Sequence, residues 1–321
     1  MGAFNTGLMS GEQRPVKKVF LSVCVLTYRR NHLLTELLSK LNEQSAPDWE
    51  VIVVDTSGEG LAKEMVEGQA VPWVRGCYPE RRFSISEGRN IAVDEARGAW
   101  ILFVDDDQIL RAEQVEAVIV KIRNQKEEFR AARLGLQTAL SEKRSEALFE
   151  NKLRKSGYFR AYDPDPNGCI KSYHLSTDGV VFKRPPEDMR FSKELGYRGG
   201  EDNDFFARYL GDLDCPVWGD IVIRDLVMPD RICLGYIWKD SYRRGCSYAQ
   251  LETEPLGRSR GKLLPKYMMD LVGSFCLLAV DIVMWRDWPK SLGLIARQCG
   301  KMAGLSGRHY ELYRDGNTNI S

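Results

Sequence analysis

A run of five apolar residues that ends in three aspartates most constrains the fold of this chain. The segment Trp100–Ile109 reads WILFVDDDQI, so the apolar residues stop abruptly at Asp105, Asp106 and Asp107. An unbroken apolar run ahead of a turn is typical of a strand that is buried on both faces, as in a mainly parallel sheet. Open α/β sheets bind their ligands beyond the carboxyl ends of such strands. The segment therefore predicts an α/β protein with a ligand site beside these aspartates.

Segments that predict strands alternate with segments that predict helices on both sides of the acidic strand. Strands are expected at residues 19–26, 49–54, 73–75, 172–183 and 217–227. Helices are expected at residues 31–42, from about residue 60, at 86–96 and at 205–210, and residues 111–160 are charged and predict mostly helix. This alternation gives a parallel sheet with right-handed crossovers, which is a nucleotide-binding architecture.

Composition excludes several other classes of protein. A net charge of +1 gives the chain no general attraction for nucleic acid. No two of the eight cysteines form a C-x-x-C pair and only three histidines are present, which argues against structural zinc. Scattered cysteines without a signal peptide indicate reduced thiols of the cytoplasm. Residues 1–15 are polar and lack an apolar core, so they predict a flexible tail.

The three adjacent carboxylates suggest a cation site. Like charges this close repel one another, so a cation is expected among them. Clustered hard oxygen ligands suit Mg²⁺ or Mn²⁺, which usually also hold substrate phosphates. The alternative is an acidic surface turn, because aspartate favours turns and helix starts.

Four short motifs occur in order along the chain. VLTYRR ends the first strand, VVDTS ends the second, EGRN precedes the acidic strand, and GGEDND follows roughly 95 residues later. Over residues 17–250, these motifs together resemble the inverting glycosyltransferases of family 2. GGEDNDFF and RRGCSYA are most similar to patterns of bacterial enzymes that build exopolysaccharides on a lipid carrier.

The resemblance implies both a fold and an activity. The fold is GT-A (Rossmann-like), with a mainly parallel sheet flanked by helices. The activity is transfer of a sugar from a nucleotide sugar, UDP-linked in our expectation, as in the hexosyltransferase class, with Mn²⁺ or Mg²⁺ as cofactor. The acceptor is a glycan or a polyprenyl-diphosphate-linked oligosaccharide of surface polysaccharide synthesis. The expected divisions are a catalytic domain at 16–255, with a donor half at about 16–110 and an acceptor half at about 165–255, and a helical segment at 256–321.

The resemblance also assigns the nucleotide-sugar site. Its residues are Thr27, Tyr28, Asp55, Arg89, Asp105, Asp106, Glu201, Arg243 and Arg244. Asp55 would accept a hydrogen bond from a uracil N3–H, and Tyr28 would offer its aromatic face to the base. Asp105 would hold the ribose or a metal-bound water, and Asp107 with Asp105 would ligate the cation that bridges the diphosphate.

Several of these residues have a purely structural alternative. Asp55 could close its strand with an Asx turn. Arg89 could be an ordinary exposed helix arginine. Arg243 and Arg244, which resemble the diphosphate-clamping motif of the family, could belong to a solvated basic helix face.

The catalytic base is expected at Asp202. An inverting transfer needs one carboxylate to take the proton from the acceptor hydroxyl as its oxygen attacks the anomeric carbon from the opposite face. The resemblance gives this role to the aspartate of the Glu201–Asp202 pair. The alternative is that Asp202 only stabilises the start of the helix that follows.

The chain departs from the family pattern at several positions. Thr56 replaces the second acid of the usual V-D-D-G-S motif, and Thr177, Asp178 and Gly179 stand where relatives often have a Gly-Asn pair. A histidine sometimes found after the last core strand is absent, with Arg224-Asp225 in its vicinity. These departures leave the acceptor and one metal contact open.

The C-terminal segment predicts attachment to a membrane surface. Residues 267–285 are long enough to span a bilayer, but Asp270 and Asp281 would be expensive inside it unless paired. An amphipathic helix in the interface fits better, with residues 291–305 as a second such helix. Its anchoring residues would be Trp285, Trp288, Lys262, Lys266, Arg286 and Lys290. The expected location is the inner face of the cell membrane; helices packed on the catalytic domain or in a dimer are the alternative.

Two other functions fit parts of the pattern. A sugar-1-phosphate nucleotidyltransferase shares the architecture but needs a glycine-rich loop after the first strand, and residues 27–34 contain no glycine. A non-catalytic sugar-nucleotide-binding protein would not need the four acids Asp55, Asp105, Asp107 and Asp202 together.

Overall fold

The computed structural model describes residues 19–69, 73–140, 148–159 and 168–308. The predicted tail at residues 1–15 lies outside them. The strands are β1 (Leu21–Thr27), β2 (Trp49–Asp55), β3 (Val74–Cys77), β4 (Trp100–Asp105), β5 (Gln108–Ile109), β6 (Ala131–Leu140), β7 (Cys169–Lys171), β8 (Val180–Lys183) and β9 (Asp214–Val227). The helices are α1 (Asn31–Asn42), α2 (Lys63–Glu67), α3 (Ile85–Glu95), α4 (Gln114–Arg123), α5 (Leu148–Arg154), α6 (Glu201–Leu210), α7 (Leu234–Thr253), α8 (Arg260–Val283) and α9 (Trp288–Leu305).

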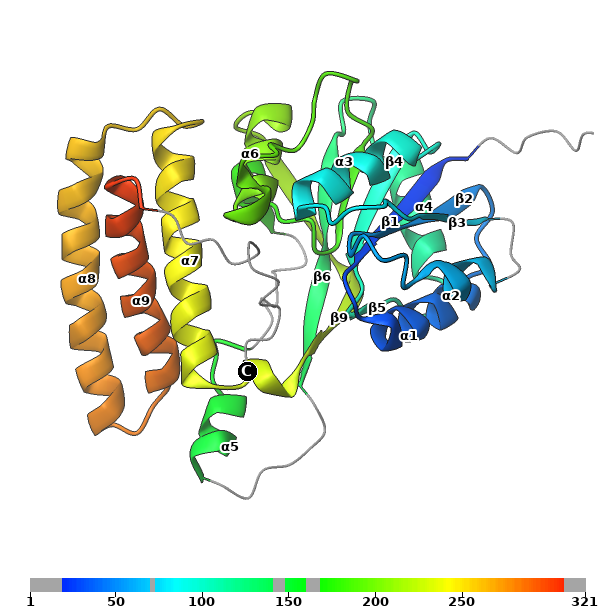
Figure 1. Cartoon of the computed structure of the whole chain (residues 1–321). Coiled ribbons are helices and arrows are strands. Elements are labelled where there is room, and N and C mark those ends of the chain that lie inside the picture. The colour runs from blue at the N-terminus through cyan, green and yellow to red at the C-terminus, as the bar shows by residue number, and fades with distance from the viewer. Residues whose placement is uncertain (1–18, 70–72, 141–147, 160–167, 309–321) are drawn as a thin grey trace, which may run out of the picture.

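One mixed sheet forms the centre of the molecule, with the strand order β3-β2-β1-β4-β8-β6-β9-β5 (Figure 1). The first four of these strands are parallel, β8 runs antiparallel to both its neighbours, and β6 is parallel to β9. β4 is buried on both faces, because Leu102 packs into one core cluster and Phe103 into the other. The predicted α/β fold with a mostly parallel sheet is therefore confirmed.

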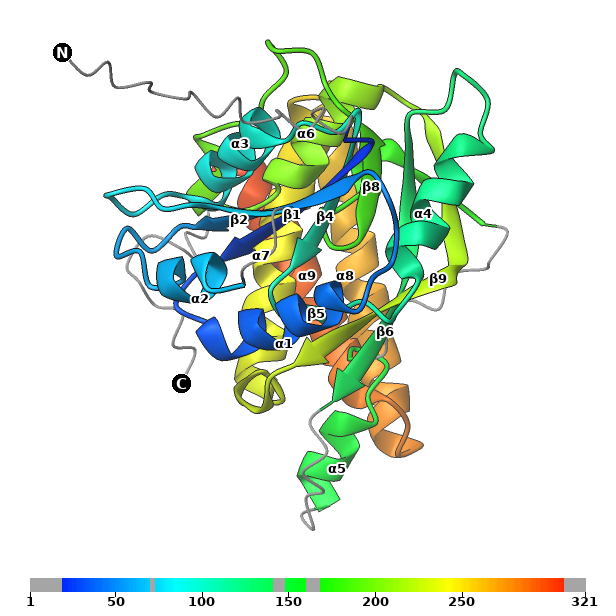
Figure 2. The same cartoon turned by 90° about the vertical axis from the view of Figure 1, so that its right-hand side faces the viewer.

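Helices cover both faces of the sheet (Figure 2). The core on one face contains apolar residues of α1, α2 and α4, such as Leu37, Val66 and Val118. The core on the other face contains residues of α3 and α6, such as Val93 and Phe205. The carboxyl ends of β1, β2 and β4 lie at one end of the sheet, because these strands run parallel to one another.

The prediction of helix across residues 111–160 is wrong in its middle. Between α4 and α5 the chain forms β6, a long strand that pairs with β8 on one side and β9 on the other. Alternating burial at Ala132, Leu134 and Leu136 suits a strand, but the charged flanks masked this pattern in the sequence. Pairing with two strands that lie far along the chain decides the conformation.

The C-terminal helices form a layer beside the sheet, in which α9 lies between α7 and α8 (Figure 1). The layer begins at Leu234, ahead of the expected boundary at residue 255. α9 buries residues on several sides, including Ile295 and Gly300, so it is a packing helix and not the second interfacial helix predicted from residues 291–305.

α8 keeps one broad apolar face in solvent. The exposed residues are Leu264, Met268, Met269, Val272, Phe275, Leu277, Val280, Ile282, Val283, Met284 and Trp285. Its carboxylates point the other way: Asp281 is buried and accepts a hydrogen bond from Ser291 of α9, and Asp270 is half-buried. Of the described residues, only this helix is long and apolar enough to cross a membrane by length and composition.

Candidate active site at the carboxyl ends of the strands

The ends of β1 and β4 bring the first motif beside the acidic triplet. These strands pair in parallel, with Leu26 opposite Asp105. The Thr27 hydroxyl donates a hydrogen bond of 2.9 Å to Asp106. The Arg30 guanidinium bridges the triplet, at 3.2 Å from Asp106 and 3.1 Å from Asp107. The sequence did not single out Arg30, although it follows the first strand at the position where such a partner is needed.

β9 completes this end of the sheet. Its Leu226 N–H donates to the Asp107 carbonyl, and Asp225 lies opposite Gln108 in the β5–β9 pair. Just beyond β9, Arg231 lies 3.5 Å from the Asp107 carboxylate. No signal in the sequence pointed to Arg231, because the β5–β9 pairing joins strands more than a hundred residues apart. For Asp225 the signal was its place near the position where relatives sometimes have a histidine.

The acids at this site are crowded and poorly solvated. Burial raises the pKa of Asp106 to about 6, although Arg30 beside it acts in the opposite direction. Burial and the neighbouring Asp107 raise the pKa of Asp225 to about 7, and the same two causes hold the pKa of Asp105 well above its usual range. Burial is the largest cause at all three acids, and repulsion from Asp107 adds to it at each of them.

The donor set suits a hard divalent cation in its chemistry. Asp105, Asp107 and Asp225 offer carboxylate oxygens, which Mg²⁺ and Mn²⁺ prefer. Within residues 19–308, leaving out the stretches that are not described, no three such side chains are already arranged around a common ion position. Arg30 and Arg231 occupy the positions beside Asp107.

Asp55 closes its strand with the turn that was predicted as the alternative to uracil binding. Its two carboxylate oxygens accept hydrogen bonds from the Ser57 and Ala62 N–H groups, both at 2.9 Å. Each carboxylate oxygen can accept a second bond. Tyr28 is half-buried, with the guanidiniums of Arg29 and Arg82 at 5.5 and 5.3 Å from its ring centre. The expected base-binding pair therefore lies in one loop region, with Asp55 rigidly held.

Arg89 and Glu201 form a buried ion pair. Each side chain is only 6% exposed, so Arg89 is not the exposed helix arginine of the alternative interpretation. α3 positions Arg89, and a capping box between Ser84 and Glu87 fixes the start of that helix. Glu201 uses one carboxylate oxygen for Arg89, and its other oxygen is buried without a hydrogen-bond partner among the described residues. The pair joins the donor half to the GGEDND motif.

Asp202 lies on the first turn of α6, next to this pair. Gly199 and Gly200 have φ of +82° and +87°, which glycine adopts without strain, and they turn the chain into the helix. Asp202 accepts a hydrogen bond of 2.8 Å from the Asn203 N–H, which helps to hold the first turn of the helix. Burial and the adjacent Glu201 raise the pKa of Asp202 to about 6, against the opposing effect of Arg89.

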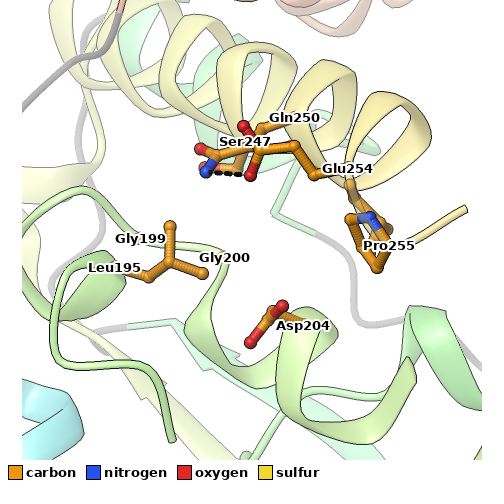
Figure 3. Close-up of a pocket in the computed structure, with 9 residues that line it drawn as sticks. Leu195, Gly199, Gly200, Asp204, Ser247, Gln250, Glu254 and Pro255 are labelled. Carbon is orange, nitrogen blue, oxygen red and sulfur yellow. Dashed lines mark hydrogen bonds between the residues drawn. The ribbon is translucent and has the colours of Figure 1, made fainter. Parts of the chain in front are cut away.

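Asp204 faces a different space from Asp202. It binds Arg208 at 2.7 Å and lines a pocket between α6 and α7 (Figure 3). Gln250 and Glu254 of α7 line the opposite side and are hydrogen-bonded to each other at 2.9 Å. Gly199 and Gly200 of the glycine turn also line this pocket, and Asp105, Asp107 and Asp202 do not.

Arg243 and Arg244 lie on α7 and share one carboxylate. Asp240 binds Arg243 at 2.8 Å and Arg244 at 2.7 Å, and the Tyr158 hydroxyl donates to it at 2.7 Å. Burial acts to raise the pKa of Asp240, but Arg244 and Arg243 hold it well below its usual range. Arg243 also reaches the glycine turn, because a side chain at Gly199 would collide with its guanidinium. These arginines are therefore part of an organised polar group and not merely a solvated helix face.

Comparisons with known proteins agree with the predicted resemblance. The sequence model of the family described as "Glycosyl transferase family 2" matches residues 22–161. An uncharacterized glycosyltransferase of Haemophilus influenzae is 33% identical over 100 residues, which cover 31% of this chain and 33% of that protein. The succinoglycan biosynthesis protein ExoM of Rhizobium meliloti is 26% identical over 258 residues, which cover 75% of this chain and 77% of that protein. The chain thus spans a third of the first relative and three quarters of the second.

A solved structure supports the fold. The mannosyltransferase PcManGT of Pyrobaculum calidifontis, determined in complex with GDP-Man and Mn²⁺, superposes with a TM-score of 0.55 at 18% identity. The superposition covers 90% of this chain and 91% of that one. At this identity the likeness concerns the arrangement of strands and helices.

Proposed function

We propose that this chain, whose residues 22–161 match the sequence model of glycosyltransferase family 2, moves a sugar from a nucleotide sugar to an acceptor hydroxyl with inversion. The observation that carries the proposal is that acids of two separate motifs, Asp105 of the acidic strand and Asp202 of GGEDND, both interact electrostatically with the buried Arg89. The buried Arg89–Glu201 pair links the elements that hold them. The nucleotide-binding loops come from the donor half, about residues 16–110, and the base comes from the acceptor half, about residues 165–255.

The donor is a UDP-sugar in this proposal. Tyr28 stacks on the uracil base. Each Asp55 carboxylate oxygen accepts one hydrogen bond within its turn, so a second lone pair can accept the N3–H of the uracil. Thr27 and Asp106 are bound to each other, so they shape the wall of the site. Arg89 acts through Glu201, whose unpartnered oxygen is available to a hydroxyl of the transferred sugar.

A divalent cation, Mn²⁺ or Mg²⁺, would be held by Asp107 and Asp105. When bound, it would neutralise charge that develops on the departing nucleotide. Arg30 pairs with Asp106 and Asp107, and Arg231 pairs with Asp107, so the two arginines hold these carboxylates in place. The pKa of Asp105 is raised without a cation, and a bound cation would favour the ionised form of this carboxylate.

Asp202 is the proposed catalytic base. With a pKa of about 6, it is ionised at neutral pH and still basic enough to accept a proton from the acceptor hydroxyl. The acceptor oxygen then attacks the anomeric carbon, and the nucleotide leaves from the opposite side. Asn203, whose side chain donates to the Leu175 carbonyl at 2.8 Å, holds the first turn of α6 in position.

The acceptor in this proposal is a glycan or a lipid-linked oligosaccharide at the cytoplasmic face of the cell membrane. The exposed apolar face of α8 supports this location, because water-exposed apolar surface of this extent favours a lipid boundary. Lys262 and Lys266 at one end and Arg286 and Lys290 at the other would attract anionic lipid headgroups. The buried Asp281 places no charge in the lipid.

Binding of nucleotide and metal tests the donor site. UDP with Mn²⁺ should raise the melting temperature, because a ligand that binds only the folded state stabilises it. Asp107→Ala should remove the part of the increase that depends on Mn²⁺. Asp188→Ala, at an exposed aspartate on another surface, is the matched control and should keep it. An undiminished Mn²⁺ effect in Asp107→Ala would contradict the assignment.

Neutral replacement of the base tests the inverting step. Asp202→Asn should lower transfer by roughly 10²-fold or more, with little change in nucleotide binding. Asp204→Asn, two positions along the same helix turn, should keep most of the transfer. If Asp202→Asn and Asp204→Asn transfer sugar at equal rates, Asp202 is not the catalytic base.

Charges placed on the exposed face of α8 test the membrane location. Met269, Val272 and Val283 are 75%, 63% and 82% exposed, so glutamates there should leave the fold intact. The triple variant should lose co-sedimentation with anionic phosphatidylglycerol vesicles. Glutamates at Leu61, Val120 and Leu213, which are exposed on other surfaces, should not have this effect. Vesicle binding that survives the α8 substitutions would show that the helix is not the contact.

A further inference from the structure

A basic cluster on α7 and α9 lies apart from the strand ends. Its centre is Asp240, which is 7% exposed and binds Arg243, Arg244 and Tyr158. Three groups thus converge on one carboxylate at the surface of α7 that faces the sheet layer.

Arg297 of α9 joins this cluster from the neighbouring helix. The two helices touch at Gly245, where an added Cβ would overlap the Arg297 carbonyl oxygen. The Arg297 guanidinium lies 5.9 Å from the ring centre of Tyr248, and Lys301 lies 4.7 Å from the same ring. Close packing of α9 on α7 therefore brings a further arginine beside Arg244.

The cluster carries more positive than negative charge. The single carboxylate of Asp240 is occupied by the guanidiniums of Arg243 and Arg244, and Arg297 adds a third positive charge from α9. Burial and the neighbouring Arg244 lower the pKa of Arg297, which shows that the two guanidiniums repel each other. Arg297 and Arg244 nevertheless keep solvent-exposed surface, with the Arg244 side chain 58% exposed. An anion of two or more charges would relieve this repulsion.

Further cationic groups lie on both sides of the cluster. Arg231, 3.5 Å from Asp107, has its guanidinium 6.0 Å from the ring centre of Tyr236, one helical turn before Asp240. On the other side, Lys301 reaches the ring of Tyr267 of α8 at 4.9 Å. Cationic groups therefore extend from the proposed donor site towards the helix with the exposed apolar face.

We propose that Arg297 is a diphosphate-binding residue, so that the C-terminal helices contribute directly to substrate binding. The inference rests on the proposed glycosyl transfer, whose substrates supply two diphosphates. One belongs to the nucleotide sugar, and the other belongs to a polyprenyl-diphosphate-linked acceptor. A guanidinium pairs with two phosphate oxygens at once, and Arg244 with Arg297 offers two such groups side by side.

Binding of three soluble probes to the full chain tests the proposal and separates the two sources. The probes are UDP with Mn²⁺, geranyl diphosphate and inorganic pyrophosphate, titrated calorimetrically at low salt. Arg297→Gln should weaken pyrophosphate binding about tenfold, because a charge-assisted contact is lost. Arg297→Lys should weaken it less, since the charge remains. Arg97→Gln, at an exposed arginine shortly before β4 and so at the amino ends of the strands, is the matched control.

The other two probes identify the source of the diphosphate. Weaker binding of geranyl diphosphate alone would assign Arg297 to the acceptor, and weaker binding of UDP with Mn²⁺ would assign it to the donor. Unchanged affinity of Arg297→Gln for all three probes would overturn the proposal. If the unaltered chain binds pyrophosphate but not UDP with Mn²⁺, that result contradicts the proposed donor site. The effect of Arg297→Gln on the affinities for pyrophosphate and geranyl diphosphate then decides the role of Arg297.

Discussion

Replacement of Arg89 by methionine should destabilise the fold far more than loss of an ordinary ion pair. Both Arg89 and Glu201 are 6% exposed, so the substitution leaves a buried carboxylate without its counter-charge. Breaking a buried pair on one side costs about 3–5 kcal/mol of the free energy of unfolding. Methionine retains the apolar contact with Phe191, over whose ring the guanidinium lies at 5.6 Å, so lost packing adds little.

Urea denaturation at pH 7.5 measures this loss, and the chain provides its own control. Lys40→Met removes an ion pair with Glu43 whose side chains are 39% and 45% exposed, and should cost at most about 1 kcal/mol. Combining Arg89→Met with Glu201→Leu should recover much of the stability, because an apolar pair replaces the ionic one. A loss for Arg89→Met no larger than that for Lys40→Met would refute the reasoning.

The same substitution should change the pH dependence of transfer. Arg89 lowers the pKa of Asp202, which burial and Glu201 raise to about 6. The base works when ionised, so activity should fall as the pH drops through about 6. Without Arg89, that fall should begin at a higher pH. A purely structural role would lower the rate at every pH without moving the midpoint.

Three further outcomes follow from the structure. Gly300→Ala should lower the free energy of unfolding by about 1–3 kcal/mol, because a Cβ at that position meets the Tyr242 backbone. Gly273→Ala has open space around it and should raise the free energy of unfolding by about 0.5–1 kcal/mol. Thermal or urea unfolding measures both changes. Asp225 has a pKa of about 7 against an ordinary 3.8, so its contribution to stability is present below about pH 4 and is lost as the pH rises through 7. In EDTA, Asp225→Asn should therefore be more stable than the unaltered chain at pH 8 but not at pH 4. Ser84→Ala should cost about 1 kcal/mol by removing the capping box of α3, as measured by the urea midpoint.

The local elements were predictable because their signals are local. The leucine spacing predicted a helix at residues 31–42, and α1 spans Asn31–Asn42. The apolar run before the aspartates predicted β4, which is buried on both faces. β6 was missed because charged flanks mask its short alternating pattern, and because its partners β8 and β9 lie far along the chain.

The candidate site was predictable only in part, for the same reason. The motifs pointed to Asp105, Asp107 and Asp202, each at an element boundary that the sequence marks. Arg231 reaches Asp107 only because β5 pairs with β9. The ion pair between Arg89 and Glu201 joins residues 112 positions apart, which no spacing rule predicts.

The strand order also determines when during synthesis the site can exist. β1 to β4 come from one continuous stretch and can pair as they leave the ribosome. β8 adds beside β4, but β6 must then be held between β8 and β9, and β9 ends only at Val227. Pairings over such long separations form late in folding. A nascent chain therefore exposes its acidic strand end long before Arg231 can reach it, and the site is among the last parts of the molecule to be completed.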